Sequence, residues 1–197
     1  MPQVSRYHPV LAALHWALAL LIFAALPLGA LVMVNIPNSD PVKIAALRSH
    51  MAGGILMLLL MLVRLGVRMR TTHPAPATAG HPALDRLAWG SHRMLYIAVL
   101  GLAGSGLFMA LQTGLPLIVL GGAGGLPPDF WMYSARTLHY VLSRLLIALI
   151  ALHVVAALYH TVILKDGLLA RMLFGRRIIS GLDRAAASNQ SQMRISP

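Results

Sequence analysis

The chain has 197 residues, of which 58% are hydrophobic and only 11% are charged, and its mean hydropathy is +0.74. Soluble domains carry about 25% charged residues, so this composition excludes an ordinary soluble protein and indicates an integral membrane protein. The net charge of +11 gathers at the ends of apolar stretches, which indicates membrane topology rather than nucleic-acid binding. The lack of cysteine excludes disulfides, thiolate haem ligation, iron–sulfur clusters and Cys-based zinc sites within this chain.

Four apolar stretches are long enough to cross a bilayer, for which a helix needs about 20 predominantly apolar residues. We expect them at about 10–34, 44–67, 91–111 and 137–164. The fold class that they predict is all-α, a bundle of four transmembrane helices. This bundle forms one domain over residues 1–180, and the small, polar segment 181–197 is predicted to be a disordered tail.

The segments between these stretches carry the residues of turns and loops. Residues 35–41 (NIPNSDP) are predicted to form a tight turn, and residues 71–82 (TTHPAPATAGHP) contain too much proline to be helical throughout. Residues 112–133 are predicted to form a Gly/Pro loop whose aromatic end suits the membrane interface.

The distribution of basic residues predicts the orientation, because cytoplasmic loops carry an excess of Lys and Arg. One side of the bundle collects Arg6, Arg64, Arg68, Arg70, Arg86, Arg93, Lys165, Arg171, Arg176, Arg177, Arg184 and Arg194, and the other side has Lys43, Arg48 and Arg136. Both termini are therefore predicted to lie in the cytoplasm.

Histidines inside the apolar stretches are the main candidates for chemistry, because an ionisable side chain at membrane depth is costly and indicates function. Six of the nine histidines fall within or at the ends of spans: His15, His50, His92, His139, His153 and His160. The other three, His8, His73 and His81, lie in terminal or loop segments and are interpreted as interfacial polar residues.

The spacing of these histidines predicts two pairs. His139 and His153 are nearly four helical turns apart, so they share one stripe and differ in depth by about 21 Å. At matching depth, His50 opens the second stretch on the outer side and would pair with His139, whereas His15 would pair with His153. His160 lies on nearly the same stripe as His153, and by depth it could equally pair with His15.

Two neutral imidazoles on opposite faces of a porphyrin iron make a six-coordinate, one-electron carrier, so the two pairs predict two b-type haems. Small residues beside the histidines would leave room for a flat macrocycle, although they also serve ordinary helix packing. These residues are Ala12, Ala13, Gly53, Gly54, Ala156 and Ala157.

Short motifs in three of the stretches resemble the bacterial cytochrome b-561 family of the inner membrane. They are ALHW in the first stretch, SHMAGG and MLVRLGVR in the second, and TLHYVLSR, ALHVVAALYH and KDGLL in the fourth. The resemblance covers about residues 5–175 and implies an inner-membrane four-helix bundle with two b haems that passes electrons between a substrate and membrane quinone. It is weaker toward the cytochrome b subunits of membrane hydrogenases.

The resemblance carries axial ligation of the haem irons onto His15, His50, His139 and His153, and thus selects His153 over His160. At least one member of the family is a superoxide oxidase that reduces ubiquinone. The resemblance therefore implies superoxide as the favoured periplasmic electron donor and ubiquinone as the acceptor, with other donors open because related chains use them.

Arginines within the spans are candidates for holding haem propionates. Arg64 lies on the same stripe as His50 at the cytoplasmic end, and it would suit a propionate or a quinone oxygen. Arg144 lies inside the fourth stretch, where its membrane cost calls for an anion such as a propionate. The competing interpretation of both is snorkelling to the membrane surface.

Quinone reduction consumes two protons, so the quinone site needs proton donors near the membrane surface. His160 and Lys165, with Asp166, form a titratable cluster at the cytoplasmic end, and His92 and Tyr96 could complete the pocket. The competing interpretation is a belt of interfacial His and Tyr residues. On the outer side, Lys43, Arg48 and Arg136 could form a cationic funnel for superoxide or an acidic protein, or could simply anchor the interface.

Three functions remain from the sequence. The first is a di-haem oxidoreductase that takes electrons from superoxide or another periplasmic donor and reduces ubiquinone. The second is a haem-b membrane anchor that relays electrons between quinone and a separate soluble dehydrogenase, hydrogenase or cytochrome. The third is a small transporter or scaffold with structural histidines, which would show no haem absorbance. Membrane lipid is a partner in all three cases.

Overall fold

The structure, a computed structural model, describes residues 3–122, 124–175 and 177–180, so the predicted tail at 181–197 lies outside the described residues. Among these described residues, four helical segments are long and apolar enough to cross a membrane. The first consists of α1 (Pro9–Pro27), the π-helical turn η1 (Leu28–Val32) and α2 (Met33–Asn35), and the others are α3 (Pro41–Arg70), α4 (Pro82–Gln112), and α6 (Ser134–Tyr159) continued by η3 (His160–Leu164). The predicted all-α fold class is confirmed.

The second and third spans begin earlier than predicted, at Pro41 and Pro82 rather than near residues 44 and 91. Proline suits the first helical turn, where its missing N–H would have no partner. A side chain precedes each of these prolines and caps its helix. Asp40 Oδ1 accepts a hydrogen bond from the Val42 N–H at 2.8 Å, and His81 Nδ1 accepts one from the Ala83 N–H at 3.2 Å.

The predicted loop over residues 112–133 contains a short helix, α5 (Leu115–Gly121), and a 3-10 turn, η2 (Phe130–Met132). Gly114 and Gly122 bound α5 with φ values of +66° and +67°, which glycine adopts at no steric cost. Leu115 and Val119 bury one side of α5 against Leu47 and Ala110, which is why this apolar segment is helical rather than an open loop.

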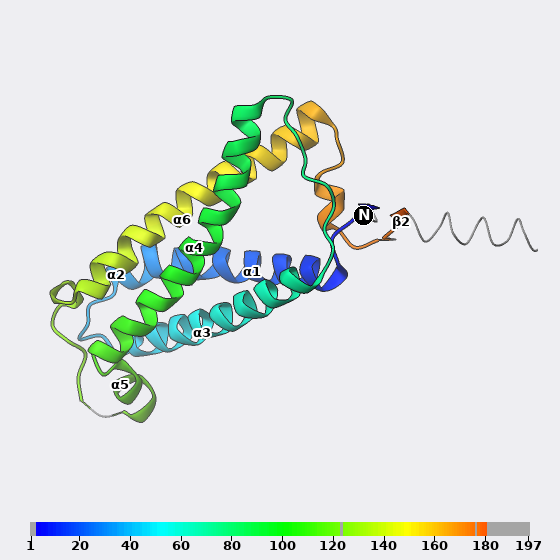
Figure 1. The fold of residues 1–197 in the computed structure, drawn as a ribbon. Coiled ribbons are helices and arrows are strands. Elements are labelled where there is room, and N and C mark those ends of the chain that lie inside the picture. The colour runs from blue at the N-terminus through cyan, green and yellow to red at the C-terminus, as the bar shows by residue number, and fades with distance from the viewer. Residues whose placement is uncertain (1–2, 123, 176, 181–197) are drawn as a thin grey trace, which may run out of the picture.

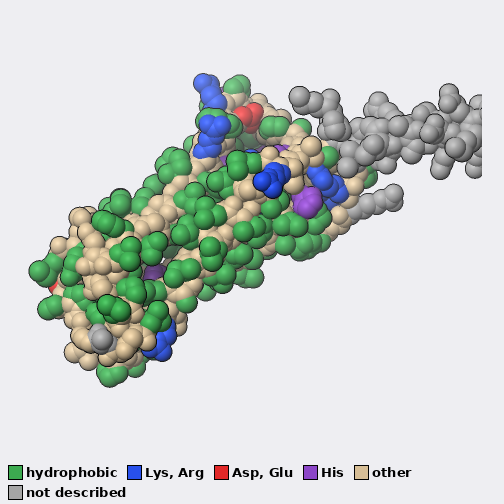
Figure 2. Space-filling view, turned by 60° about the horizontal axis from the view of Figure 1, so that its bottom comes forward, with side chains coloured by type: hydrophobic (Ala, Val, Ile, Leu, Met, Phe, Trp, Pro, Cys, Tyr) green, Lys and Arg blue, Asp and Glu red, His purple; other side chains and the backbone are tan. Residues whose placement is uncertain are grey.

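The four long helices pack as two pairs, α1 with α3 and α4 with α6, which Figure 1 shows diverging toward the end that carries the chain termini. A central core joins the pairs and contains Leu18, Met57, Met61, Ala98, Val99 and Leu146. Hydrophobic side chains cover the long outer surface in Figure 2, whereas most of the Lys and Arg side chains in that view gather toward the ends. This surface suits a bundle surrounded by lipid.

The end of the bundle that carries the termini, called the terminal end, is closed by bonds between distant parts of the chain. Strand β1 (Gln3–Val4) pairs with β2 (Ile179–Ser180) in an antiparallel two-stranded sheet. Arg6 donates to the Ala170 carbonyl at 2.8 Å, and Trp16 Nε1 donates to the Met172 carbonyl at 3.0 Å. Arg177 donates both to the Arg6 carbonyl and to Thr72 in the extended connector between α3 and α4. The opposite end, called the α5 end, contains α5 and η2.

Candidate functional site

Four histidines form two facing pairs inside the bundle. His50 on α3 and His139 on α6 have ring centroids 6.2 Å apart and planes inclined by 75°. His15 on α1 and His153 on α6 have centroids 6.2 Å apart and planes inclined by 69°. The structure therefore brings together the two pairs expected from depth, one toward the α5 end and one toward the terminal end.

The separation within each pair fits one metal ion between two imidazoles. Bonds from a metal ion to imidazole nitrogen are about 2.0–2.1 Å long, which puts two ligating nitrogens about 4 Å apart. The ring centres lie slightly farther out than these nitrogens, so their expected separation is a little over 6 Å. In the described part of the chain no cluster of three or more His, Asp or Glu side chains suits a bare metal ion. The donor set thus fits a group that fills the remaining positions itself, as a porphyrin does.

The pair toward the α5 end borders a cavity of about 480 Å³, called the outer cavity. Three glycines, Gly29, Gly54 and Gly106, line this cavity, and Gly29 and Gly106 lie against the imidazole rings. A Cβ at Gly29 would lie 3.2 Å from His50 Cε1, and one at Gly106 would lie 3.1 Å from His139 Cε1. Of the small residues expected beside the histidines, Gly54 lines the cavity, although a Cβ at Gly53 or Gly54 would meet nothing within 4 Å. The sequence did not indicate Gly29 or Gly106.

A serine on α4 contacts the second histidine of this pair. Ser105 Oγ lies 3.1 Å from His139 Nδ1 and donates to the Leu102 carbonyl at 2.9 Å. On the other side of the pair, His50 Nδ1 is buried and has no hydrogen-bond partner among the described residues. The sequence did not single out Ser105, because only the approach of α4 to α6 brings it to His139.

Basic side chains contribute to the lining of the outer cavity. Arg136 lies with its guanidinium carbon 4.4 Å from the Trp131 ring centre, and that of Arg144 lies 4.9 Å from the Tyr140 ring centre. Lys43 also lines the cavity, but its ammonium group donates to the Met33 and Ile36 carbonyls. Asp129 is the acidic residue of the lining. Of the three residues predicted to form a cationic funnel, Lys43 and Arg136 line the cavity. The third, Arg48, donates to the Val119 carbonyl at 2.7 Å.

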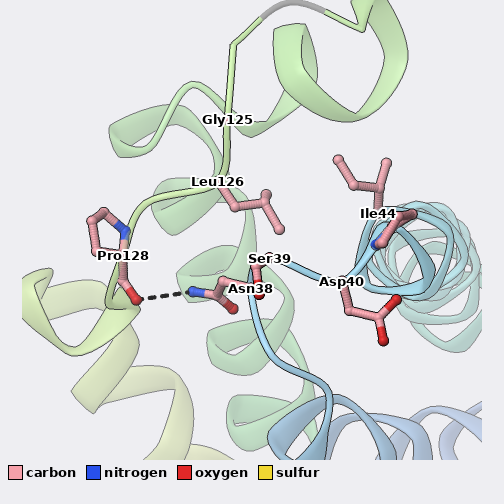
Figure 3. Close-up of a pocket in the computed structure, with 8 residues that line it drawn as sticks. Asn38, Ser39, Asp40, Ile44, Gly125, Leu126 and Pro128 are labelled. Atoms are coloured by element: carbon pink, nitrogen blue, oxygen red, sulfur yellow. Dashed lines mark hydrogen bonds between the residues drawn. The ribbon is translucent and has the colours of Figure 1, made fainter.

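An open hollow of about 880 Å³ adjoins the outer cavity and shares Asn38 and Pro128 with its lining. Figure 3 shows Asn38 directed at the Pro128 carbonyl, and its amide also donates to the Pro127 carbonyl at 2.8 Å. These bonds hold the predicted turn between α2 and α3 against the segment that follows α5. The hollow and the outer cavity are therefore neighbours on either side of this contact.

Arg64 lies near the pair at the terminal end and is buried, with 8% of its surface exposed. Its Nη1 donates to the Leu11 carbonyl at 2.7 Å and its Nε donates to the Tyr96 hydroxyl at 3.1 Å. A guanidinium carries five N–H donors, so Arg64 keeps capacity for an anion. Its inward position contradicts the snorkelling interpretation, because the side chain is held between α1 and α4.

His92 lies beside the same pair, with its ring centroid 5.2 Å from that of His153. Its Nδ1 is 2.7 Å from the Ala88 carbonyl, and because a carbonyl can only accept, this nitrogen carries hydrogen. Three imidazoles therefore meet at the terminal end of the bundle. His92 contacts His153 and Tyr96 contacts Arg64, and the pocket that these two residues would complete stays a prediction.

His160 is buried in η3 and its Nδ1 lies 2.6 Å from Asp166 Oδ2. The hydrogen bond from His160, followed by that from the Leu168 N–H, holds the pKa of Asp166 below its ordinary value. Lys165 is exposed and adopts φ of +51°, a left-handed residue that ends the helix. Of the predicted proton donors, His160 and Asp166 are thus brought together. The alternative pairing of His160 with His15 has no ring contact among the described residues.

Comparisons with known proteins find a matching family model and several similar proteins. Residues 6–175 match the family model described as prokaryotic cytochrome b561. The protein "Cytochrome b561 homolog 2" of Escherichia coli is 30% identical over 177 residues, 86% of this chain and 92% of that protein. "Cytochrome b562" of Cereibacter sphaeroides is 28% identical over 177 residues, 88% of this chain and 98% of that protein. "Probable superoxide oxidase CybB" of Yersinia pestis is 29% identical over 131 residues, 65% of this chain and 74% of that protein.

Proposed function

Because this chain belongs to the prokaryotic cytochrome b561 family of membrane haem proteins, we propose that it holds two b haems and carries electrons across a bacterial inner membrane. His50 and His139 would hold one haem, and His15 and His153 would hold the other. The observation that carries this assignment is the equal 6.2 Å separation of both imidazole pairs, which share helix α6. When bound, haem iron between two imidazoles supplies one-electron transfer.

We infer that the α5 end faces the periplasm and the terminal end faces the cytoplasm, because basic residues concentrate at the terminal end. The electron donor then reaches the outer cavity through the hollow beside Asn38 and Pro128. Arg136, Arg144 and Lys43 give this region a positive field, with Asp129 as the opposing charge. Such a field holds haem propionates and attracts a small anion, so superoxide is the proposed donor.

Ubiquinone is the proposed acceptor, and its site lies at the terminal end. Two superoxide anions give up one electron each and become two molecules of oxygen, and one quinone takes both electrons and two protons to become a quinol. Asp166, outside the membrane span, and the buried His160 form the proton path from solvent in this proposal. Arg64 holds the propionate or quinone oxygen, and His92 and Tyr96 line the same region.

A second function, a haem-b anchor for a separate redox protein, is favoured by one observation. Leu117 and Leu120 on α5 are each 71% exposed, and Met132 on η2 is 78% exposed. An exposed apolar face at the end of the bundle can bind a protein partner. In that case the same haems exchange electrons with the partner rather than with superoxide.

The first test is the visible spectrum of the detergent-purified protein, oxidised and reduced, with haem quantified as the pyridine haemochrome. Two b haems per chain with low-spin bands are expected, and a protein without haem would overturn the proposal. Stopped-flow mixing with superoxide, in the presence of a soluble ubiquinone, then separates the two functions. Rapid superoxide consumption with one quinol formed per two superoxide anions supports the oxidase, and no reaction by the isolated chain supports the anchor.

A further inference from the structure

We propose that Ser105 is a positioning residue that fixes which nitrogen of His139 carries hydrogen and thereby lowers the redox potential of the haem at the α5 end. This inference rests on the proposed ligation by His50 and His139. It goes beyond that proposal, because it assigns the control of one haem's potential to a residue that ligates nothing.

The hydrogen-bond geometry around Ser105 settles the direction of each bond. Ser105 is 5% exposed, and its Oγ lies 2.9 Å from the Leu102 carbonyl and 3.1 Å from His139 Nδ1. A carbonyl only accepts, so the one hydroxyl hydrogen goes to Leu102. Oγ then accepts from the Nδ1–H of His139. If Ser105 instead donated its hydrogen to His139 Nδ1, no hydrogen would remain between Oγ and the Leu102 carbonyl, and the imidazole hydrogen would lie on Nε2.

This direction prepares His139 for metal binding. With hydrogen on Nδ1, Nε2 keeps the lone pair that a metal ion requires. Gly106, the next residue of α4, lets the ring lie close against the helix, since a Cβ there would stand 3.3 Å from the same Nδ1. Ser105 and Gly106 together hold the ring in one orientation with its other nitrogen free.

The same bond changes the electron density that His139 offers to iron. An acceptor on the outer nitrogen raises the basicity of a histidine ligand. Ser105 is a stronger acceptor than an isolated hydroxyl because it donates to Leu102 at the same time, and linked hydrogen bonds polarise one another. A more basic ligand stabilises ferric over ferrous iron, so the bond lowers the midpoint potential.

The effect is confined to one of the two sites. His50 Nδ1, on the facing ligand, has no partner among the described residues. In the described part of the chain, neither His15 nor His153 has a side-chain hydrogen bond of this kind. Ser105 therefore makes the two haems unequal, which favours one direction of electron flow between them.

The test compares the midpoint potentials of both haems in the full-length, detergent-purified wild type and in Ser105→Ala, Ser105→Thr and Ser105→Cys. In Ser105→Ala, one midpoint is expected to rise and the other to stay unchanged. The expected change is on the order of tenfold in the preference for ferric iron, which corresponds to about 59 mV for a one-electron couple. Ser105→Thr keeps the hydroxyl and is expected to retain the wild-type midpoint.

Ser91→Ala is the matched control, because Ser91 is also buried on α4 and donates in the same way to the Ala88 carbonyl, with no imidazole on its oxygen. It should leave the midpoint of the α5-end haem unchanged. If Ser105→Ala does not fold, Ser105→Cys provides the comparison, with a smaller rise because sulfur is a weak acceptor.

Electron paramagnetic resonance of the ferric protein provides a second readout. Ser105→Ala, which removes the acceptor, should shift one low-spin signal. Ser105→Thr, which keeps the hydroxyl, should restore the wild-type signal. A signal that stays shifted in Ser105→Thr would indicate an effect of packing rather than of the hydrogen bond. Unchanged midpoints in both Ser105→Ala and Ser105→Cys, with two haems bound, would overturn the role of Ser105 and leave the proposed function intact. A wild type without haem would instead overturn the proposed function.

Discussion

Gly106 lies directly against the imidazole of His139, so that a methyl group at this position would come 3.1 Å from Cε1 and 3.3 Å from Nδ1. Side chains rarely approach one another so closely, so the ring would have to move. His139 cannot move far without changing its separation from His50. Alanine at this position would therefore press the ring by a few tenths of an ångström and disturb its 6.2 Å spacing from His50.

Gly106→Ala is therefore expected to weaken or abolish haem binding at the α5 end, and to reduce the haem content from two per chain toward one. Pyridine haemochrome quantification measures this directly. Gly104→Ala is the matched control, because it lies on the same helix and a Cβ there would meet nothing within 4 Å. Alanine at Gly104 should keep both haems and stabilise the helix by about 0.5–1 kcal/mol. Two haems in Gly106→Ala would show that the ring tolerates displacement.

Replacing single histidines by leucine distinguishes the ligands from the other intramembrane histidines. His139→Leu and His153→Leu should each lose one haem, because each removes one of two axial bonds. His160→Leu should keep both, since His160 bonds to Asp166 rather than facing His15. Loss of a haem from His160→Leu with both haems retained in His153→Leu would instead assign His160 as the ligand.

Tyr96→Phe is expected to destabilise the protein by about 1–3 kcal/mol, because it leaves the buried Arg64 Nε–H without its acceptor. Thermal unfolding in detergent, followed by haem absorbance, would show a lower Tm. Tyr159→Phe is a suitable control, since Tyr159 is 41% exposed and its hydroxyl makes no hydrogen bond to another described residue. Equal Tm values for the two variants would mean that Arg64 finds another acceptor.

Asp166 should contribute an acid-sensitive part of the stability at the terminal end. Its pKa is lower in the folded protein than the ordinary 3.8, mainly through the hydrogen bond from His160. The folded state then binds fewer protons than the unfolded state, so this stabilisation is complete above the ordinary pKa and is lost as the pH falls below it. Tm measured from pH 6 to pH 3 should fall less steeply in Asp166→Asn than in the wild type. Parallel curves would argue against a role for this carboxylate.

The natural absence of cysteine allows the orientation to be tested with single cysteines. Ser39→Cys, in the turn at the α5 end, should react with a membrane-impermeant maleimide in intact spheroplasts. Ala75→Cys, in the connector at the terminal end, should react only after lysis. Both positions are exposed. The reverse pattern would place the termini outside the cytoplasm.

The helices could be predicted from the sequence because lipid solvation leaves a direct signature, namely long apolar runs bounded by polar residues. The starts of α3 at Pro41 and of α4 at Pro82 were not predicted. The length of an apolar run marks only the part of a helix inside the bilayer core, and both helices extend beyond it. Helix α5 was missed for a different reason. Its Gly-rich flanks resemble a loop, and only the packing of Leu115 and Val119 makes the segment helical.

The histidine pairs could be anticipated from depth, since the rise along a helix is fixed. The contacts of Gly29, Ser105 and His92 could not be, because each depends on how closely a neighbouring helix approaches, and sequence spacing within one helix carries no such information.

The bonds at the terminal end also constrain how the protein is made. Arg6 donates to the Ala170 carbonyl, and β1 pairs with β2. Residues among the first ten of the chain therefore bind partners that are synthesised more than 160 residues later. Until then, α1 and α3 can already occupy the bilayer while their N-terminal segment stays unpaired. Closure of this end therefore cannot begin before the residues around Ala170 have been synthesised, and a fusion partner attached before Gln3 would stand next to the strand that has to pair.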